Sequence, residues 1–293
     1  MLRDNNSVFK TFFVAVCLCL VCSLVVASAA VGLRGMIRAN KERYRMSNVL
    51  SVAGFDAQAI RSGGGVETVF KNTIDVLYVN LDTGEEASAE LAELLGVPVE
   101  ELGFRFDAVK IGKENKPGLA TSFERSADNV AGLIGGRENF AAIYLKKNDA
   151  GEVDKYIFPI RGAGLWSTLL GFIALDSDLE TVAGITFYEH GETPGLGGEV
   201  DNPQWKESWV GKRVYAASGG TATGVPEVQL RLVKGAADEN DKYGIDGLAG
   251  ATITANGVTH LIAFWMGDRG YGPFIVRERN RRGMQATSES GGR

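Results

Sequence analysis

Two threonines, Thr252 and Thr254, are the side chains whose type and position most suggest chemistry. They lie in the stretch DGLAGATIT (246–254), between a glycine-rich turn and a segment with helical periodicity. A helix N-terminus presents unpaired N–H groups and a partial positive charge, so it is a natural seat for phosphate. A threonine there most often acts as an N-cap. No Walker lysine or GxGxxG spacing accompanies it, which disfavours a nucleotide-binding loop.

The segment after these threonines has the pattern of an amphipathic helix. Its apolar residues recur at i, i+3, i+4 and i+7, a spacing that places them on one helical face. These residues are Val258, Leu261, Ile262 and Trp265. We therefore expect a helix that begins near Thr252–Thr254 and buries this face.

A long loop is predicted before that helix. The run ETPGLGGEVDNPQW (192–205) contains Pro194, Pro203 and three glycines, which argue against both a strand and a helix. An ordered loop of this composition suits the lining of a flat ligand. A simple long connection explains the composition equally well.

Strand-like segments surround these elements. Residues 155–175 read as two strands around a glycine-rich loop, and the segment after them forms a hairpin strand with Ile185 and Phe187 on one face. Thr186 and Tyr188 fall on the other face. Closer to the N-terminus, residues 74–81 and 140–147 indicate strands and residues 87–96 a helix. The predicted class is α+β, with a mixed sheet-and-helix globular part.

Composition excludes several functions. The formal net charge of −5 over 293 residues leaves no basic surplus for binding nucleic acid. All three cysteines (Cys17, Cys19 and Cys22) lie in one apolar segment, so thiolate metal sites and disulfides are not expected in the rest of the chain. His190 and His260 stand far apart, and a structural hydrogen bond suits each better than metal ligation. We predict no metal site.

Residues 11–33 carry no charge and are predicted to form a transmembrane helix after a short cytoplasmic segment (1–10). At about 1.5 Å per residue, a helix of this length spans a hydrocarbon core of about 30 Å. The sequence ASA at 27–29 also resembles a signal-peptide cleavage site, but the apolar run is longer than a typical signal core and favours a retained anchor.

The orientation of this helix is ambiguous from charge alone. Two basic residues precede it and five follow closely, which would keep the large domain in the cytoplasm. Long domains, however, translocate largely regardless of charge. The absence of cysteine beyond the helix weakly favours an oxidising compartment.

Several segments together resemble a known family. The stretch DGLAGAT is similar to the flavinylation motif Asp-Gly-x-Ser/Thr-Gly-Ala-Thr. Three further segments resemble, in the same order, the C subunit of the sodium-translocating NADH:quinone reductase: GLWSTLLGFIAL, GITFYEHGETPGLGGEVDNPQWKESWVGK and GYGPFI. RANKERYRMSNVLSVAGF, directly after the anchor, resembles the same family. The resemblance extends from the anchor to about Val276 and is densest over 162–275.

The resemblance implies FMN held through a phosphodiester to Thr252, which a separate flavin transferase forms. Ala249 stands where the motif has Ser or Thr; the lost hydroxyl removes at most a hydrogen bond of about 1 kcal/mol, so we expect modification to persist. Thr254 is the alternative acceptor. The expected cofactor-binding residues are Thr252, Gly250, Ala251, Asp246, Glu192, Thr193, Leu196, Gly197, Trp166 and Ser167.

Within that site, each residue has an expected role. The backbone near Gly250 and Ala251 would bind the phosphate, and the transferase would recognise Asp246. The isoalloxazine would lie against the 192–197 loop, with Trp166 and Ser167 completing the pocket. No residue of this chain is assigned as catalytic.

For the whole chain, the resemblance implies an electron-carrying subunit that is inactive alone. Its partners would be the other five subunits of an inner-membrane complex that oxidises NADH, reduces ubiquinone and moves Na⁺ from cytoplasm to periplasm, with this globular domain in the periplasm. We expect a juxtamembrane helix and α+β subdomain (34–155), an FMN-binding subdomain (156–276) and a disordered tail (277–293). The alternatives are the homologous flavoprotein of the Rnf ferredoxin:NAD oxidoreductase and a membrane-anchored flavin sensor without electron relay.

Overall fold

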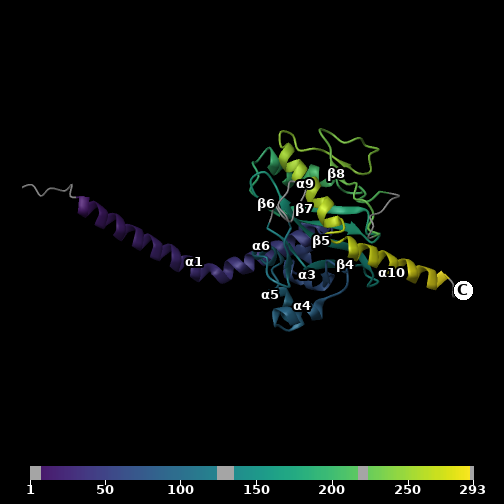
Figure 1. The fold of residues 1–293 in the computed structure, drawn as a ribbon, viewed down its shortest axis with the longest axis horizontal. Helices are drawn as coiled ribbons and strands as arrows, with labels where there is room; N and C mark the ends of the chain where they lie inside the picture. The colour runs from purple at the N-terminus through teal and green to yellow at the C-terminus, as the bar shows by residue number, and fades with distance from the viewer. Residues whose placement is uncertain (1–7, 124–134, 217–223, 291–293) are drawn as a thin grey trace, which may run out of the picture. The chain divides into compact units, whose positions relative to one another are not determined.

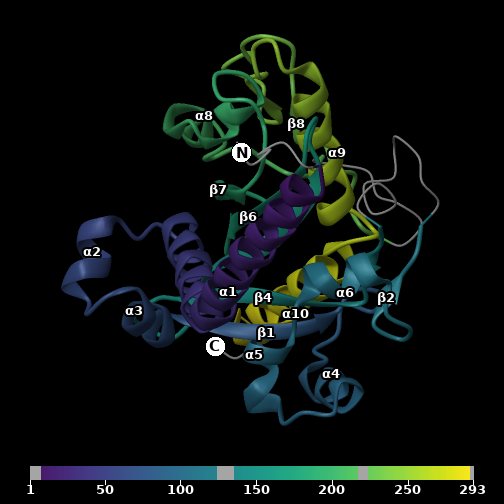
Figure 2. The same ribbon diagram turned by 90° about the vertical axis from the view of Figure 1, so that its left-hand side faces the viewer.

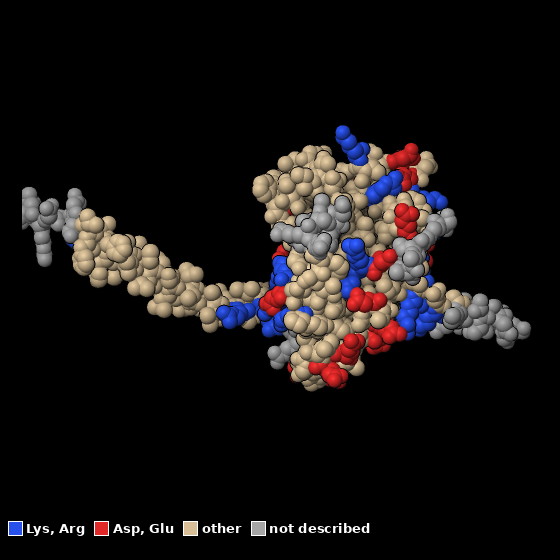
Figure 3. Space-filling model, viewed as in Figure 1, with Lys and Arg blue, Asp and Glu red and all other residues tan. Residues whose placement is uncertain are grey.

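The computed structural model describes residues 8–123, 135–216 and 224–290, and the chain divides into two compact units, 1–46 and 47–293. Helix α1 (Val8–Val52) is, in the described part, the one helix long and apolar enough to cross a membrane, a property that signal sequences share. Its apolar stretch carries no Lys, Arg, Asp or Glu (Figure 3). The predicted helical segment is therefore present, and residues 1–7 lie outside the described range.

An antiparallel five-stranded sheet organises the unit 47–293 (Figure 1). Its order is β1-β4-β5-β6-β7. The strands are β1 (Ile74–Asn80), β4 (Phe140–Lys147), β5 (Val153–Ala163), β6 (Thr168–Asp176) and β7 (Val182–Glu189). The predicted strands at 74–81 and 140–147 and the predicted hairpins are confirmed, as is the α+β class.

The sheet is covered on both faces, so two apolar cores form. In β7, Ile185 and Phe187 pack into one core, while Tyr188 packs against the other, as the alternation predicts. The interior strand β6 is almost continuously apolar because both of its faces are buried.

Helices cover one face near β1. They are α2 (Ala57–Ser62), α3 (Val66–Thr73), α4 (Ser88–Leu95), η1 (Val99–Glu101), α5 (Leu102–Arg105) and α6 (Ala108–Glu114), with the short strands β2 (Ala120–Thr121) and β3 (Arg137–Glu138). Figure 2 shows α4 and α5 beside β1, and α4 contacts that strand. The helix predicted at 87–96 is α4, which ends at Gly96 in the left-handed conformation.

The other face carries the elements that matter for the site. They are η2 (Gly197–Asp201), α8 (Pro203–Glu207), β8 (Arg231–Leu232), β9 (Gly244–Ile245), α9 (Thr252–Met266) and α10 (Gly272–Ser290). The four apolar residues predicted to line one face of α9 are all buried. The helix packs on β5 so closely that a Cβ on Gly257 would lie 2.2 Å from the carbonyl oxygen of Ala163.

One sequence prediction, that of a loop without helix at 192–205, needs correction, and the sheet crosses the predicted subdomain boundary. The subdomain boundary at 155/156 falls inside β5, and the sheet joins both halves, because β4 and β5 pair as a hairpin (Tyr144 opposite Ile157). The loop 192–205 contains η2 and α8, since Asn202 caps a helix that begins with Pro203, a position where proline is tolerated.

The predicted tail (277–293) begins inside α10. Residues 277–290 continue α10, and residues 291–293 lie outside the described part. The first turns of α10 are tied to the sheet: Glu278 accepts a hydrogen bond from Tyr156 (2.7 Å), and Arg279 and Arg282 donate to the carbonyls of Leu179 and Ser177 (2.9 Å each). These contacts hold the start of α10 against neighbouring elements, although its sequence is strongly polar. Disorder of the tail stays a prediction.

Candidate functional site

Thr252 is the first residue of α9, and no side-chain hydrogen bond caps this helix. Ala251 takes the N-cap position with φ −126° and ψ 51°. Thr252 is exposed, so its hydroxyl stands at a helix end whose first N–H groups need partners. The usual role of a terminal threonine, capping its own helix, is therefore not the one observed.

The turn before Thr252 is held in place by contacts to distant residues. Gly250 has φ +68°, a left-handed conformation that favours glycine, and a Cβ there would lie 2.9 Å from Cδ2 of Leu196. The Asp246 carbonyl accepts a hydrogen bond from the indole N–H of Trp205 (2.9 Å), and its carboxylate accepts one from the Ala237 amide (2.8 Å). The 246–251 turn and the 192–198 loop thus lie side by side.

Glu192 links the three loops that surround the site. Its Oε2 accepts hydrogen bonds from the Thr254 hydroxyl (2.6 Å) and the Leu165 amide (3.1 Å). Its Oε1 accepts from the amides of Trp166 (2.9 Å) and Ser167 (3.3 Å). Both oxygens are engaged within the protein, and the residue is buried. The contact of Glu192 with FMN stays a prediction.

These hydrogen bonds control the charge of Glu192. Burial raises the pKa of its carboxyl, but the hydrogen bonds from Thr254 and from the backbone amides of Trp166, Leu165 and Ser167 outweigh it and leave the pKa below its usual value. Glu192 is therefore ionised at neutral pH.

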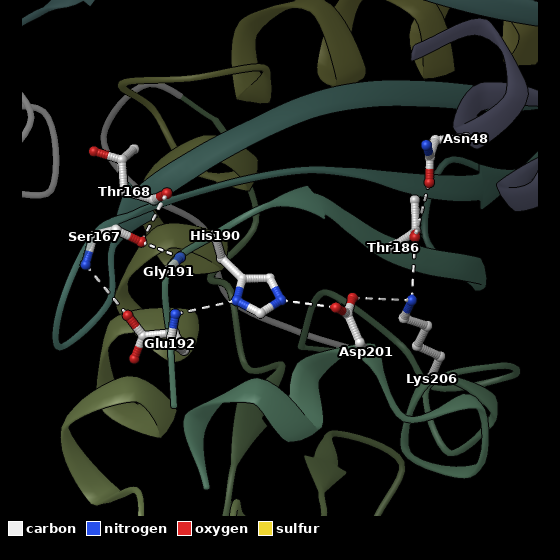
Figure 4. A network of polar contacts seen from close by, with 9 residues as sticks. All are labelled: Asn48, Ser167, Thr168, Thr186, His190, Gly191, Glu192, Asp201 and Lys206. Carbon is white, nitrogen blue, oxygen red and sulfur yellow. Dashed lines mark hydrogen bonds and ion pairs between the residues drawn. The ribbon is translucent and has the colours of Figure 1, made fainter. Parts of the chain in front are cut away.

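A polar network supports Glu192 from behind (Figure 4). The Glu192 amide donates to Nδ1 of His190 (3.2 Å), which leaves the proton on Nε2 to donate to Asp201 (2.8 Å). Lys206 contacts both Asp201 and Thr186 (3.4 Å each). The hydrogen-bonding role predicted for His190 is confirmed.

Ser167 fixes the neighbouring loop rather than standing free. Its hydroxyl accepts a hydrogen bond from the Gly191 amide at 2.6 Å, so the 164–167 loop is joined to the chain just before Glu192. This contact and those of Glu192 hold the loop between β5 and β6 against the start of α9.

Exposed apolar side chains surround the end of α9. The 164–167 loop, the 192–198 loop and the first turn of α9 each contribute at least one, and together they form the apolar rim: Leu165 (46% exposed), Trp166 (70%), Leu196 (43%) and Ile253 (60%). Large apolar side chains with this exposure in one place are typical of a surface that binds a ligand or partner.

The remaining predicted residues have simpler positions. Thr193 is exposed, and its carbonyl accepts the amides of Leu196 and Gly198, which shapes the loop. Gly197 is buried where a Cβ would lie 2.7 Å from the Thr254 hydroxyl oxygen. Thr254, the alternative acceptor, is only 1% exposed.

Sequence reasoning did not find Trp205, His190 and Asp201 as parts of the site. Trp205 approaches Asp246 across 41 positions, and His190 acts through the amide of Glu192. No periodicity or motif spacing connects these pairs, so only the folded chain brings them together.

A second hollow lies farther along α9. It is a cleft of about 410 Å³ whose lining includes Pro226, His260, Phe264 and Arg269, and it contains none of the predicted site residues.

The glycine turn, the uncapped helix end with its exposed hydroxyl and the apolar rim define a domain suited to a flat, phosphate-bearing cofactor. In agreement, the profile of the FMN-binding domain family matches residues 164–267. The C subunit of the Na⁺-translocating NADH-quinone reductase of Yersinia pestis is 40% identical over 277 residues, which cover 94% of this chain and 95% of the relative. The corresponding protein of Vibrio alginolyticus is 38% identical over 280 residues, 96% and 98% of the two chains.

A solved structure supports the same grouping. The crystal structure of NqrC from Shewanella oneidensis superposes with a TM-score of 0.67 at 29% identity, over 83% of this chain and 99% of that one. The chain belongs to the family formed by the C subunits of the Na⁺-translocating NADH-quinone reductases. The relatives are thus parts of an oxidoreductase complex.

Proposed function

We propose that this chain carries FMN through a phosphodiester to Thr252 and relays electrons within a Na⁺-translocating NADH:quinone reductase complex. The observation that carries this proposal is the exposed Thr252 hydroxyl at the uncapped start of α9. The ester would form when the Thr252 oxygen attacks the flavin-side phosphorus of a flavin diphosphate donor. The new O–P bond replaces the P–O bond of the diphosphate, a nucleoside monophosphate leaves, and the hydroxyl proton passes to solvent. A separate flavin transferase is expected for this step.

The residues present fit such a group. The first N–H groups of α9 would bind phosphate oxygens, and the left-handed Gly250 keeps a side chain away from that approach. Leu165, Trp166 and Leu196 would cover the flat ring system, which the protein positions and shields from water. When bound, the flavin supplies the electron-transfer chemistry.

The wider role follows from the family. We propose that the chain is anchored by α1 in the inner membrane and works with the other five subunits, which move Na⁺ from cytoplasm to periplasm while ubiquinone is reduced. The globular unit would lie in the periplasm, and the isolated subunit would have no activity. The close relatives described above favour this complex over the Rnf oxidoreductase and over a sensor.

In-gel flavin fluorescence tests the attachment. Co-expressed with a flavin transferase, the denatured wild-type polypeptide should fluoresce, and Thr252→Val should not. Thr252→Ser, which keeps a hydroxyl, is the matched control and should retain the signal. Fluorescence that persists in Thr252→Val would move the attachment to another residue.

Topology needs its own experiment. A reporter enzyme that is active only outside the cytoplasm should be active when fused after Gly283, within α10. A stable but inactive fusion would place the globular unit in the cytoplasm, as the count of basic residues alone suggests.

A further inference from the structure

The carboxylate of Glu192 is buried without a cation. In the described part of the chain, the ion pairs include none to Glu192, and its four partners are one hydroxyl and three amides. A buried charge without an opposite charge is unfavourable unless hydrogen bonds and dipoles replace water. The N-terminus of α9 and the three amides supply that replacement.

The surrounding backbone is fitted to this carboxylate. A Cβ on Gly164 would lie 2.5 Å from Oε1, and one on Gly197 would lie 2.8 Å from Oε2. Both glycines belong to loops that border Thr252. Because the backbone of these glycines packs closely around the carboxylate, the Glu192 side chain has little room for another position. The carboxylate therefore sets the distance between the 164–167 loop and the 192–198 loop.

The hydrogen bond to this carboxylate gives Thr252 and Thr254 different environments. Consecutive residues of a helix are rotated by about 100°, so Thr252 and Thr254 project about 200° apart. The hydroxyl of Thr254 points inward and donates to Glu192, with 1% exposure, whereas Thr252 is exposed. Because both residues belong to the first turn of α9, holding the Thr254 side chain inward also sets the outward direction of the Thr252 side chain.

We propose that Glu192 is the positioning residue that makes Thr252, and not Thr254, the hydroxyl offered for modification. This rests on the proposed function. Glu192 binds the first turn of α9 to the 164–167 loop, presents Thr252 beside the apolar rim and keeps the Thr254 hydroxyl engaged as a donor.

The test compares Glu192→Gln with Glu199→Gln, in the full chain. Both changes remove one carboxylate from the segment 192–201, but Glu199 is half-buried and, among the contacts described, its carboxylate meets only the Asn202 side chain (2.8 Å). In Glu192→Gln, the new side-chain NH₂ group would have to face an N–H donor, since three of the four partners are amides that can only donate.

The first measurement is amide hydrogen exchange in chain made without the transferase. Glu192→Gln should speed exchange at Leu165, Trp166 and Ser167 by roughly tenfold, as expected when charged hydrogen bonds are lost. Glu199→Gln should match the wild type. Unchanged exchange in Glu192→Gln would overturn the proposal.

The second measurement is the mass and the peptide map of chain co-expressed with the transferase. Glu192→Gln should lower the flavin-bearing fraction by roughly tenfold or place flavin on Thr254. If the variant is instead labelled as fully as the wild type and only on Thr252, even with faster exchange, Glu192 has a purely structural role and the proposal is overturned.

A second variant, Thr254→Val, tests the proposal if Glu192→Gln does not fold. Thr254→Val removes one of the four donors and keeps the side-chain shape. It should also lower labelling of Thr252, and full labelling would count against the proposal. If the wild-type chain itself carries no flavin in this mass spectrum, the proposed function is overturned instead. The wild-type spectrum shows this before any variant is compared, so the two failures are distinguishable.

Discussion

The region before β5 and the region after it are built in different ways. Residues 66–123 and 135–147 form helices and strands whose apolar faces fill a core, with ion pairs such as Lys110–Glu114 and Lys147–Asp75 at the surface. Residues 164–216 and 224–254 instead depend on side chains that reach across loops to backbone groups, such as Glu192 to Trp166 and Trp205 to Asp246.

The difference indicates where function lies. Burial of apolar side chains fixes the first region, and the charged side chains buried there are in ion pairs, Arg137 with Asp82 and Glu138 with Arg161. The second region buries the carboxylate of Glu192 without a cation, exposes the indole of Trp166 and leaves the start of α9 uncapped. Each of these features costs stability on its own, so we infer that they are retained for binding.

The largest effect is expected where α9 meets β5. Gly257→Ala would force a Cβ to 2.2 Å from the Ala163 carbonyl and should destabilise the chain by about 3 kcal/mol. Gly103→Ala, also in a helix but with only the Tyr78 hydroxyl 3.9 Å away, should be neutral or slightly stabilising. Urea unfolding of both variants measures this contrast. Equal destabilisation would mean that the two regions are packed alike.

Lowering the pH should destabilise the folded chain through protonation of Glu192. Because its pKa is lowered in the folded chain, the stability it contributes is present above the pKa of the unfolded chain and is lost as pH falls through the folded value. The melting temperature of the wild type should therefore fall on acidification more steeply than that of Glu192→Gln. Glu199→Gln serves as the control. Parallel curves for the wild type and Glu192→Gln would contradict the linkage.

A smaller effect on stability is expected at Trp166. Because its side chain is 70% exposed, Trp166→Ala should change the free energy of unfolding by less than about 0.5 kcal/mol. In flavin-bearing protein, the same variant should shift the visible absorption of the flavin, since an aromatic contact is removed. An unchanged spectrum would exclude Trp166 from the rim that covers the ring.

The smallest effect is expected at the surface of the first region. Lys147→Ala breaks an exposed ion pair with Asp75 and should cost no more than about 0.5 kcal/mol. Thermal melts at low and high salt measure it. If Lys147→Ala lowers the free energy of unfolding by more than Trp166→Ala does, surface ion pairs contribute more to the stability of this region than this account assumes.

The same division explains how much the sequence revealed. Periodicity located β1, β4, α4 and α9, because helices and strands with one buried face repeat their apolar residues at fixed intervals. The motif also pointed to Thr252. The bond from Thr254 to Glu192 spans 62 positions, and the residues that close such a contact have no spacing rule. Sequence reasoning therefore selected Glu192 as a candidate, but it could not give its hydrogen-bond partners.

The start of α10 illustrates the same limit of sequence reasoning. Arg279 and Arg282 look like solvated charges in sequence, yet they donate to carbonyls in the turn between β6 and β7. A polar run becomes an ordered helix when unpaired backbone oxygens lie within its reach.

The intact mass of the full chain, co-expressed with its flavin transferase, tests the central claim most directly. The account predicts a wild-type mass increased by one FMN phosphodiester and a Thr252→Val mass equal to that of the bare polypeptide. A wild-type chain with no added mass, or an equal gain in Thr252→Val, would contradict it.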